Sequence, residues 1–348
     1  MNLLSACAQI APVEPMMMNN PLLANSRPWC IGRFVFDRPA ASEISSERYG
    51  FWGDEIEIRR NVSFQTFDHE MRKREETLRR EKRESSISYQ EMKERGLESM
   101  RFKVNVPMLE QVASPTQNSR VFLFTMDGKR PDPFFKQEGY VLAGGTMLAM
   151  KSTVPKRIIQ SAIAGLSEVL RDVTYRDDWT VPTEPGFCID GALIGGRSRD
   201  SERVTQSFAL LPGRYAGLLI RMRDAVESDK KLSLRQTLPD LRGNLNNKGF
   251  SGNVRFLRDG KRQVAGMEAE EVLFSITDGT IQIYQFYLMA QGDPETVAQP
   301  HTEIRLTLGG PSTHSLTPEL ATSPVDEAGA IQMWDTLLNS MRLRPGAL

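Results

Sequence analysis

The second half of the chain contains a series of short apolar segments that have the composition of strands. These segments cover residues 254–257, 272–276, 281–289 and 302–308. Asp259-Gly260 and Asp278-Gly279 lie between them, and Asp-Gly pairs supply the positive φ angles of tight hairpin turns. Strands that are joined by tight turns pair antiparallel. This half of the chain is therefore restricted to a largely antiparallel sheet.

The first half mixes strand and helix patterns. Polar and apolar residues alternate over residues 55–65, as in a strand with one face exposed to water. From Asp68 to about Arg95, glutamate and arginine recur four residues apart, which favours a helix with a narrow apolar stripe. Asp127-Gly128 predicts a turn between later strands. Those later strands are predicted at residues 101–106, 120–126 and 140–153.

A helix is predicted to close each half of the chain. In the first half, Pro155 begins a helix with an apolar face. Near the C-terminus, Ser323 is a suitable N-cap and Pro324 is suited to the first turn. The buried face of this last helix is predicted to contain Ile331, Trp334, Leu337, Leu338 and Met341.

A chain of 348 residues is long enough for two domains, each with its own core. We predict an α+β fold of two related domains, each a mainly antiparallel sheet packed with helices. The first domain is assigned to residues 29–178 and the second to residues 179–348. Residues 1–28 precede them and have the proline-rich composition of a tether.

Charge and hydropathy exclude two classes of partner. Lysine and arginine equal aspartate and glutamate at 44 each, so no net charge attracts nucleic acid or an anionic membrane. The basic residues within 72–83 alternate with glutamates, as on a solvated helix. Apolar runs are too short and interrupted to span a bilayer, so no transmembrane helix is predicted. Recognition of a partner must depend on local shape and local charge.

The N-terminus contains a motif typical of exported lipoproteins. Leu4-Ser5-Ala6-Cys7 has the pattern of a lipobox, at which bacterial lipoprotein precursors are cut before the cysteine is acylated. A complete signal has a basic segment and an apolar stretch of roughly 7 to 15 residues before this point, and Cys7 lies close to the first residue. The motif is either a truncated signal or a chance match of common residues. The first interpretation predicts a periplasmic protein with a possible lipid anchor through Cys7.

The other two cysteines lie in similar surroundings. Cys30 and Cys188 each begin an apolar, strand-like stretch. In an oxidising compartment they are expected to form a disulfide if their Cα atoms approach within about 7 Å. Two buried free thiols are the alternative, because unpaired cysteine is among the most buried residue types.

We find no arrangement of residues that indicates catalysis. A Gly-x-Ser-x-Gly elbow, a dinucleotide fingerprint and a P-loop are all absent from the sequence. The three histidines, His69, His301 and His314, lack the spacing of metal ligands and are expected to be exposed or at a strand edge. Adjacent acids such as Asp177 and Asp178 are typical of a solvated surface. We therefore predict a protein that is not an enzyme and has no catalytic residue, metal site or cofactor.

Several motifs resemble those of one protein family. Residues 186–192, 264–271 and 326–347 resemble the C-terminal domain of immunity proteins cognate to type VI secretion lipase effectors. Residues 30–34 resemble the start of the N-terminal domain of that family. The resemblance implies a periplasmic protein that binds a phospholipase toxin and sterically blocks access to its active site. A cell-envelope lipoprotein with a structural or assembly role remains the alternative.

Two irregular loops are candidates for contact with the toxin, because they carry residue types that are common at interfaces. The first loop is predicted at residues 195–203 and the second at residues 244–250. The candidate contact residues are Arg197, Arg199, Arg203, Asn244, Asn246, Asn247 and Phe250.

Overall fold

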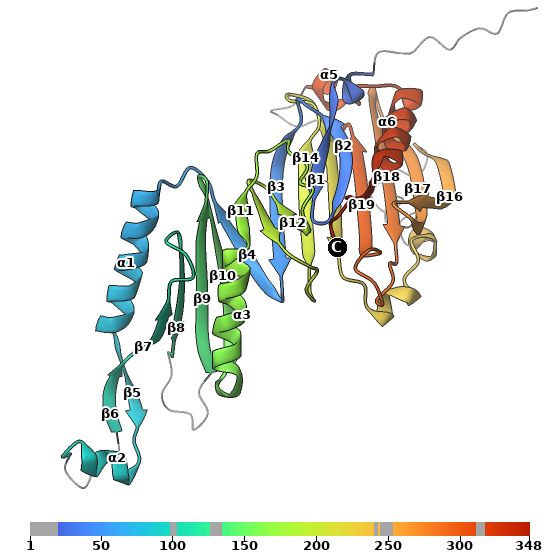
Figure 1. The fold of residues 1–348 in the computed structure, drawn as a ribbon. Coiled ribbons are helices and arrows are strands. Elements are labelled where there is room, and N and C mark those ends of the chain that lie inside the picture. Colours follow the sequence, from blue (N-terminus) through green and yellow to red (C-terminus); the bar gives the residue numbers. More distant parts are fainter. Residues whose placement is uncertain (1–19, 98–102, 126–133, 240–242, 244–252, 311–316) are drawn as a thin grey trace, which may run out of the picture.

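Twelve strands form one continuous sheet that passes through both halves of the molecule (Figure 1). The computed structural model describes residues 20–97, 103–125, 134–239, 243, 253–310 and 317–348. Each pair of neighbouring strands in this sheet is antiparallel. The predicted α+β class, with mainly antiparallel sheets packed with helices, is confirmed.

The spatial order of the strands differs from their order in the chain. From one edge of the large sheet to the other, the strands are β16 (Val254–Val264), β17 (Met267–Asp278), β18 (Ile281–Ala290), β19 (His301–Leu308), β15 (Ala216–Arg223), β14 (Arg203–Ala209), β3 (Glu43–Phe51), β4 (Asp54–Arg59), β10 (Thr146–Pro155), β9 (Phe134–Ala143), β8 (Ser119–Phe124) and β7 (Leu109–Ala113).

Smaller sheets and helices complete the fold. One three-stranded sheet contains β1 (Ser26–Ile31), β2 (Phe34–Pro39) and β20 (Arg342–Leu343), and another contains β11 (Val173–Tyr175), β13 (Ala192–Gly195) and β12 (Gly186–Ile189). β5 (Lys82–Ser86) pairs with β6 (Lys103–Pro107). The α-helices are α1 (Phe64–Arg80), α2 (Tyr89–Glu94), α3 (Ile159–Arg171), α5 (Pro318–Ala321) and α6 (Glu327–Ser340). Short 3-10 helices are Pro21–Leu23, Lys156–Ile158, Glu227–Lys231 and Arg235–Thr237.

The two halves of the chain share the large sheet. β3 comes from the first half and pairs with β14 of the second, so hydrogen bonding crosses the boundary that the sequence suggested at residues 178 and 179. The N-terminal strand β2 pairs with the C-terminal β20, and α6 packs against β2. Figure 1 shows β1 and β2 beside α6. The assignment of residues 29–178 and 179–348 to separate domains stays a prediction.

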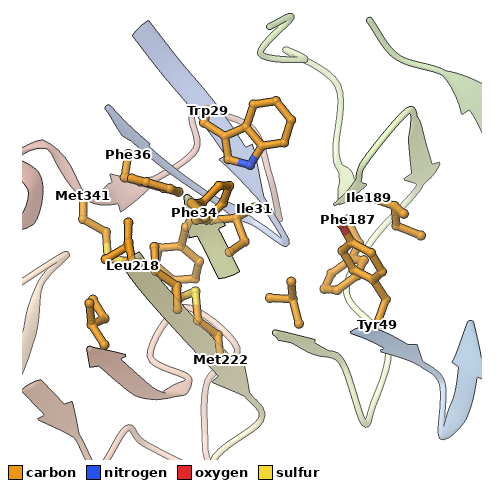
Figure 2. Packing of buried hydrophobic residues seen from close by; sticks show 14 of the residues in the cluster. Trp29, Ile31, Phe34, Phe36, Tyr49, Phe187, Ile189, Leu218, Met222 and Met341 are labelled. Atoms are coloured by element: carbon orange, nitrogen blue, oxygen red, sulfur yellow. The ribbon is translucent and has the colours of Figure 1, made fainter. Parts of the chain in front are cut away.

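The main core lies on one face of the large sheet, beneath β1, β2 and α6. Leu218 and Met222 of β15 project into it and meet Phe34 and Met341, which come from opposite ends of the chain (Figure 2). Trp334 of α6 is buried in the same cluster, as the sequence predicted. Alternate residues of β15 are buried, which is the pattern of a strand with one solvated face.

Cys30 and Cys188 form a disulfide, with their Cα atoms 5.9 Å apart. The cysteines lie on β1 and β12, and an isolated bridge between Gly32 and Cys188 pairs the same two segments. The predicted pairing is thus present in the structure, and the alternative of two free thiols does not apply.

The helix predicted from Asp68 to Arg95 is wrong in its extent. α1 begins at Phe64, because Ser63 accepts a hydrogen bond from the backbone of Thr66, and it ends at Arg80. The chain then forms β5, whose partner β6 lies beyond residue 102. A pairing between distant segments therefore overrides the local helical pattern of the charges.

Two turns and one helix N-cap also differ from those expected from the sequence. Asp259-Gly260 lies inside β16, and the turn to β17 falls at Ala265-Gly266, where both residues have positive φ. Gly144-Gly145 forms a hairpin turn that divides residues 140–153 between β9 and β10. The N-cap of α6 is Asp326, not Ser323. Asp278-Gly279 does join β17 to β18 as predicted, whereas Asp127-Gly128 lies outside the described residues.

Candidate partner-binding surface

The large sheet has one face that is covered only toward its two ends. Phe122 of β8 packs against α1, and the next residue, Leu123, packs against α3, so these helices lie on opposite faces. α3, the small sheets and α6 cover one face along its length. On the other face, α1 covers one end, and Leu234 and Leu238 pack over the strands near the other end. No other part of the chain that the structure describes covers the strands between them.

We call this uncovered region the open sheet face. It consists of the outward side chains of β3, β14, β15 and β19, together with Tyr287 of β18. The strand register sets its residues in rows across the strands. One row contains Arg48, Thr205, Arg221 and Glu303, and the next contains Ser46, Ser207, Leu219, Arg305 and Tyr287.

Glu303 is the centre of a small polar network at one end of the open sheet face. Arg221 forms an ion pair with it at 2.9 Å, and Nε2 of His301 lies 3.4 Å from its carboxylate. The hydrogen bond with His301, aided by Arg221, lowers the pKa of Glu303 below its ordinary value. His301 itself is buried, so the expectation of an exposed or edge histidine is wrong for this residue.

His301 also faces a buried acid on its other side. Its Nδ1 lies 4.0 Å from the carboxylate of Asp229, which Arg223 binds through two nitrogens at 2.7 Å each. The hydrogen bond from Arg223 lowers the pKa of Asp229. These pairings satisfy the charges at this edge of the face, so they are structural contacts within the chain.

Three other arginines of the open sheet face form no ion pair within the described residues. The guanidinium of Arg305 lies over the ring of Tyr287, 4.6 Å from its centre. Burial raises the pKa of Tyr287, so this ring is neutral beside the arginine. The side chain of Arg203 lies across Gly50, and a Cβ atom at residue 50 would collide with Nε of Arg203. Arg48 is exposed on β3.

Two clefts deepen the open sheet face. One has a volume of about 390 Å³ and is lined by Tyr215, Leu219 and Arg305 among others. The second has a volume of about 190 Å³ and is lined by Leu234, Tyr287 and Arg221 among others. Both clefts are lined by apolar or aromatic side chains together with arginine. This is the composition of a protein interface, in which aromatic residues and arginine are enriched.

A third cleft lies where α1 stands beside the sheet. It has a volume of about 650 Å³, with Phe124 and Leu78 among its apolar residues. Arg74 of α1 binds Glu138 of β9 through two nitrogens, at 2.9 and 2.8 Å. Glu70, which lies four residues before Arg74 in the helical charge pattern, binds Arg59 instead. This cleft is separate from the two clefts of the open sheet face and shares no lining residue with them.

The residues that the sequence proposed as contacts do not form one group. Arg203 lies on the open sheet face, and Arg197 is exposed on the loop after β13. Arg199 pairs with Glu168 of α3 at 3.2 Å and lies over Trp52, so it belongs to the opposite side of the sheet. The remaining proposed contacts, together with the lipidation candidate, lie outside the described residues: Asn244, Asn246, Asn247, Phe250 and Cys7.

Sequence reasoning missed Arg48, Arg221 and Arg305 as members of one surface. Their strands lie far apart in the chain and become neighbours only through the sheet order. A partial signal was present, since apolar and polar residues alternate from Ile220 to Arg223 at the end of β15. Mixed helix and strand signals over residues 204–226 concealed that alternation.

The described residues contain no group of three or more His, Cys, Asp or Glu side chains that could hold a metal ion. Among the described helices, none has the length and apolar character needed to cross a membrane.

Solved structures share the fold over nearly the full chain. The apo structure of the immunity protein TplEi of T6SS from Pseudomonas aeruginosa has a TM-score of 0.71 and 23% identity, and the match covers 92% of this chain and 98% of that chain. The crystal structure of a Tle4-Tli4 complex gives a TM-score of 0.73 and 23% identity, and covers 94% and 99%. TplEi complexed with an "L" peptide gives a TM-score of 0.69 and 23% identity, and covers 93% and 99%.

Sequence comparisons point to one family. No curated protein matches the chain. Two family models do match it in succession: residues 27–165 match the N-terminal domain of Tle cognate immunity protein 4, and residues 180–346 match its C-terminal domain. The two models follow each other in the order of one protein and together span most of the chain. The protein therefore belongs to the family of Tle cognate immunity protein 4.

Proposed function

We propose that this protein binds a cognate type VI phospholipase effector in the periplasm and inhibits it sterically, which protects the cell from its own and its siblings' toxin. The observation that carries this proposal is the open sheet face, which contains two clefts, is edged by α1 and by residues 227–238, and is covered by no other described part of the chain. Rigid strands hold the backbone of this face in place, so little backbone ordering entropy is lost on binding.

Inhibition by obstruction requires no chemistry from the inhibitor. A lipase needs an open apolar entrance to reach a membrane lipid, and a rigid surface that fits over this entrance excludes the substrate. The polar groups of the open sheet face support this interpretation, because His301, Glu303 and Asp229 bind one another or arginine. The solved relatives include an effector and immunity pair, Tle4-Tli4, which supports a similar partner for this chain.

The disulfide supports a periplasmic location, because structural disulfides persist in oxidising compartments. An export signal that is cleaved before Cys7, which then carries a lipid anchor, is the route that we propose. Localisation of a tagged full-length chain, with and without Cys7→Ser, tests the anchor separately from inhibition.

Co-expression with a candidate cognate lipase, taken from the genes next to this one, tests the main proposal. Directed to the periplasm, the lipase is expected to kill cells alone and to be harmless with this protein. The purified pair is expected to form a complex without lipase turnover. An exported immunity protein that leaves killing unchanged contradicts the proposed function, as does turnover of a lipid or ester by this protein alone.

A further inference from the structure

We infer that the open sheet face recognises an acidic segment of the effector that also carries at least one apolar side chain, and that Arg48, Arg203 and Arg305 supply the electrostatic part of this recognition. The inference rests on the proposed function and assigns the chemistry of the contact.

The first argument is a local excess of positive charge. β3, β14, β15 and β19 place five arginines on this face: Arg48, Arg203, Arg221, Arg223 and Arg305. Glu303 and Asp229 bind Arg221 and Arg223, which leaves three arginines without a carboxylate within ion-pair distance among the described residues. Glu43, opposite Ala209 at the start of β3, is one further acid of this face, so a net positive charge remains. Since the whole chain is neutral, with 44 residues of each sign, this excess is specific to the surface.

The second argument is the spacing of these arginines. Arg48 and Arg305 are three strands apart, on β3 and β19, and lie in neighbouring rows. With strands about 4.8 Å apart and rows about 7 Å apart along the strands, their backbones are separated by about 16 Å. An extended segment of about four or five residues spans that distance. Between them, β14 carries the small side chains of Thr205 and Ser207, and β15 carries Leu219 and Arg221. Arg48, Arg203 and Arg305 are all exposed. Arginine is suited to this role because its planar group binds carboxylates through two nitrogens.

The third argument is the apolar floor between the charges. Leu219 lies next to Arg305 across the strands, and both line the cleft of about 390 Å³ beside Tyr215. An occupant with acidic groups alone would leave this floor in contact with water. A segment with an apolar side chain between its acids matches both the floor and the rim.

The shape of the face favours a protein segment over an anionic membrane. α1 stands at one end of the face, and Leu234 and Leu238 cover the strands at the other. A flat bilayer therefore contacts α1 and the segment with Leu234 and Leu238 before it reaches the strands between them. A projecting protein loop can reach those strands.

Charge reversal tests the inference with a matched control. The test variant carries Arg48→Glu, Arg203→Glu and Arg305→Glu. The control variant carries Arg157→Glu, Arg171→Glu and Arg342→Glu, which change the same charge at exposed arginines around α3 and β20. Affinity for the purified neighbouring lipase is measured by calorimetry at low and high ionic strength, with circular dichroism as a check on folding. A neutral variant with glutamine at the three test positions is measured in parallel.

We expect the test variant to bind the lipase at least about 100-fold more weakly than the wild type, because like charges in an interface cost several kcal/mol. The affinity of the glutamine variant should lie between those of the wild type and the test variant. Its binding should lose most of its dependence on salt. The control variant should bind as the wild type does.

Equal affinities for the wild type and the folded test variant overturn the inference while the proposed function stands. Equal weakening of test and control variants also overturns it. Binding of the wild type to phosphatidylglycerol vesicles, lost in the test variant while lipase binding persists, assigns the arginines to a membrane instead. Absence of any complex between the wild type and the lipase contradicts the proposed function itself.

Discussion

Buried arginines hold together segments that are distant in the chain. Arg33 binds both carboxylate oxygens of Glu202, at 2.7 and 2.6 Å, and also donates to the carbonyl of Ala347. Arg344 is fully buried and donates to the carbonyls of Pro182, Glu184 and Gly186. Each arginine satisfies several backbone or carboxylate oxygens that burial would otherwise leave unpaired.

Removal of one partner from the Arg33–Glu202 pair is expected to be strongly destabilising. The two side chains are 2% and 6% exposed. Arg33→Met leaves the Glu202 carboxylate buried without its cation, which should reduce the free energy of unfolding by about 3 to 5 kcal/mol. Urea denaturation measures the effect.

The double variant Arg33→Met with Glu202→Leu is the control for this prediction. It removes both charges and should recover much of the loss, because an apolar pair has no charge to desolvate. A single variant that loses less than about 1 kcal/mol would show that water reaches the carboxylate.

At the level of elements, local sequence signals predicted where the helices lie more accurately than where each helix begins and ends. The buried face predicted for α6 is correct at Trp334, Leu337 and Leu338, because burial of that face follows the 3.6-residue period. Its start was placed three residues early, since Ser323 is also a good capping residue. In the structure, Ser323 accepts a hydrogen bond from the amide of Val325, so it shapes the turn before the helix.

Asp326→Ala is expected to destabilise the protein by about 1 kcal/mol. Its carboxylate accepts a hydrogen bond from the amide of Gly329 at 2.8 Å, and the alanine variant leaves that amide without this partner. Asp326→Ser should retain most of the stability, since serine is also a good N-cap. Thermal unfolding of the three proteins measures the difference, and equal midpoints for alanine and serine would refute the capping role.

At the level of the whole molecule, the disulfide joins segments 158 residues apart. Chain entropy predicts that such a long closed loop stabilises the folded state by about 5 kcal/mol at most. Reduction, or the double variant Cys30→Ser with Cys188→Ser, should therefore lower the urea midpoint substantially. Added reductant should leave the serine variant unchanged. Two free thiols in exported protein, detected by alkylation and mass spectrometry, would contradict the pairing.

Several features of this protein follow from its sequence alone. Antiparallel strands, the apolar face of α6 and the family resemblance are encoded in neighbouring residues, because side-chain periodicity and short motifs are local properties. The cysteine pair was identified as a candidate on the same basis, although local sequence left its bonding open. Residues such as Arg203 could be proposed as contacts by residue type alone.

Only the tertiary structure decided which segments lie side by side. β3 pairs with β14 across the proposed domain boundary, and β5 pairs with β6 where the charges favoured a helix. The open sheet face exists because α3, α6 and the small sheets cover one face along its length, whereas the other face is covered only toward its ends. Strand pairing depends on partners that are distant in the chain, and exposure depends on what covers each face, so a local pattern specifies neither.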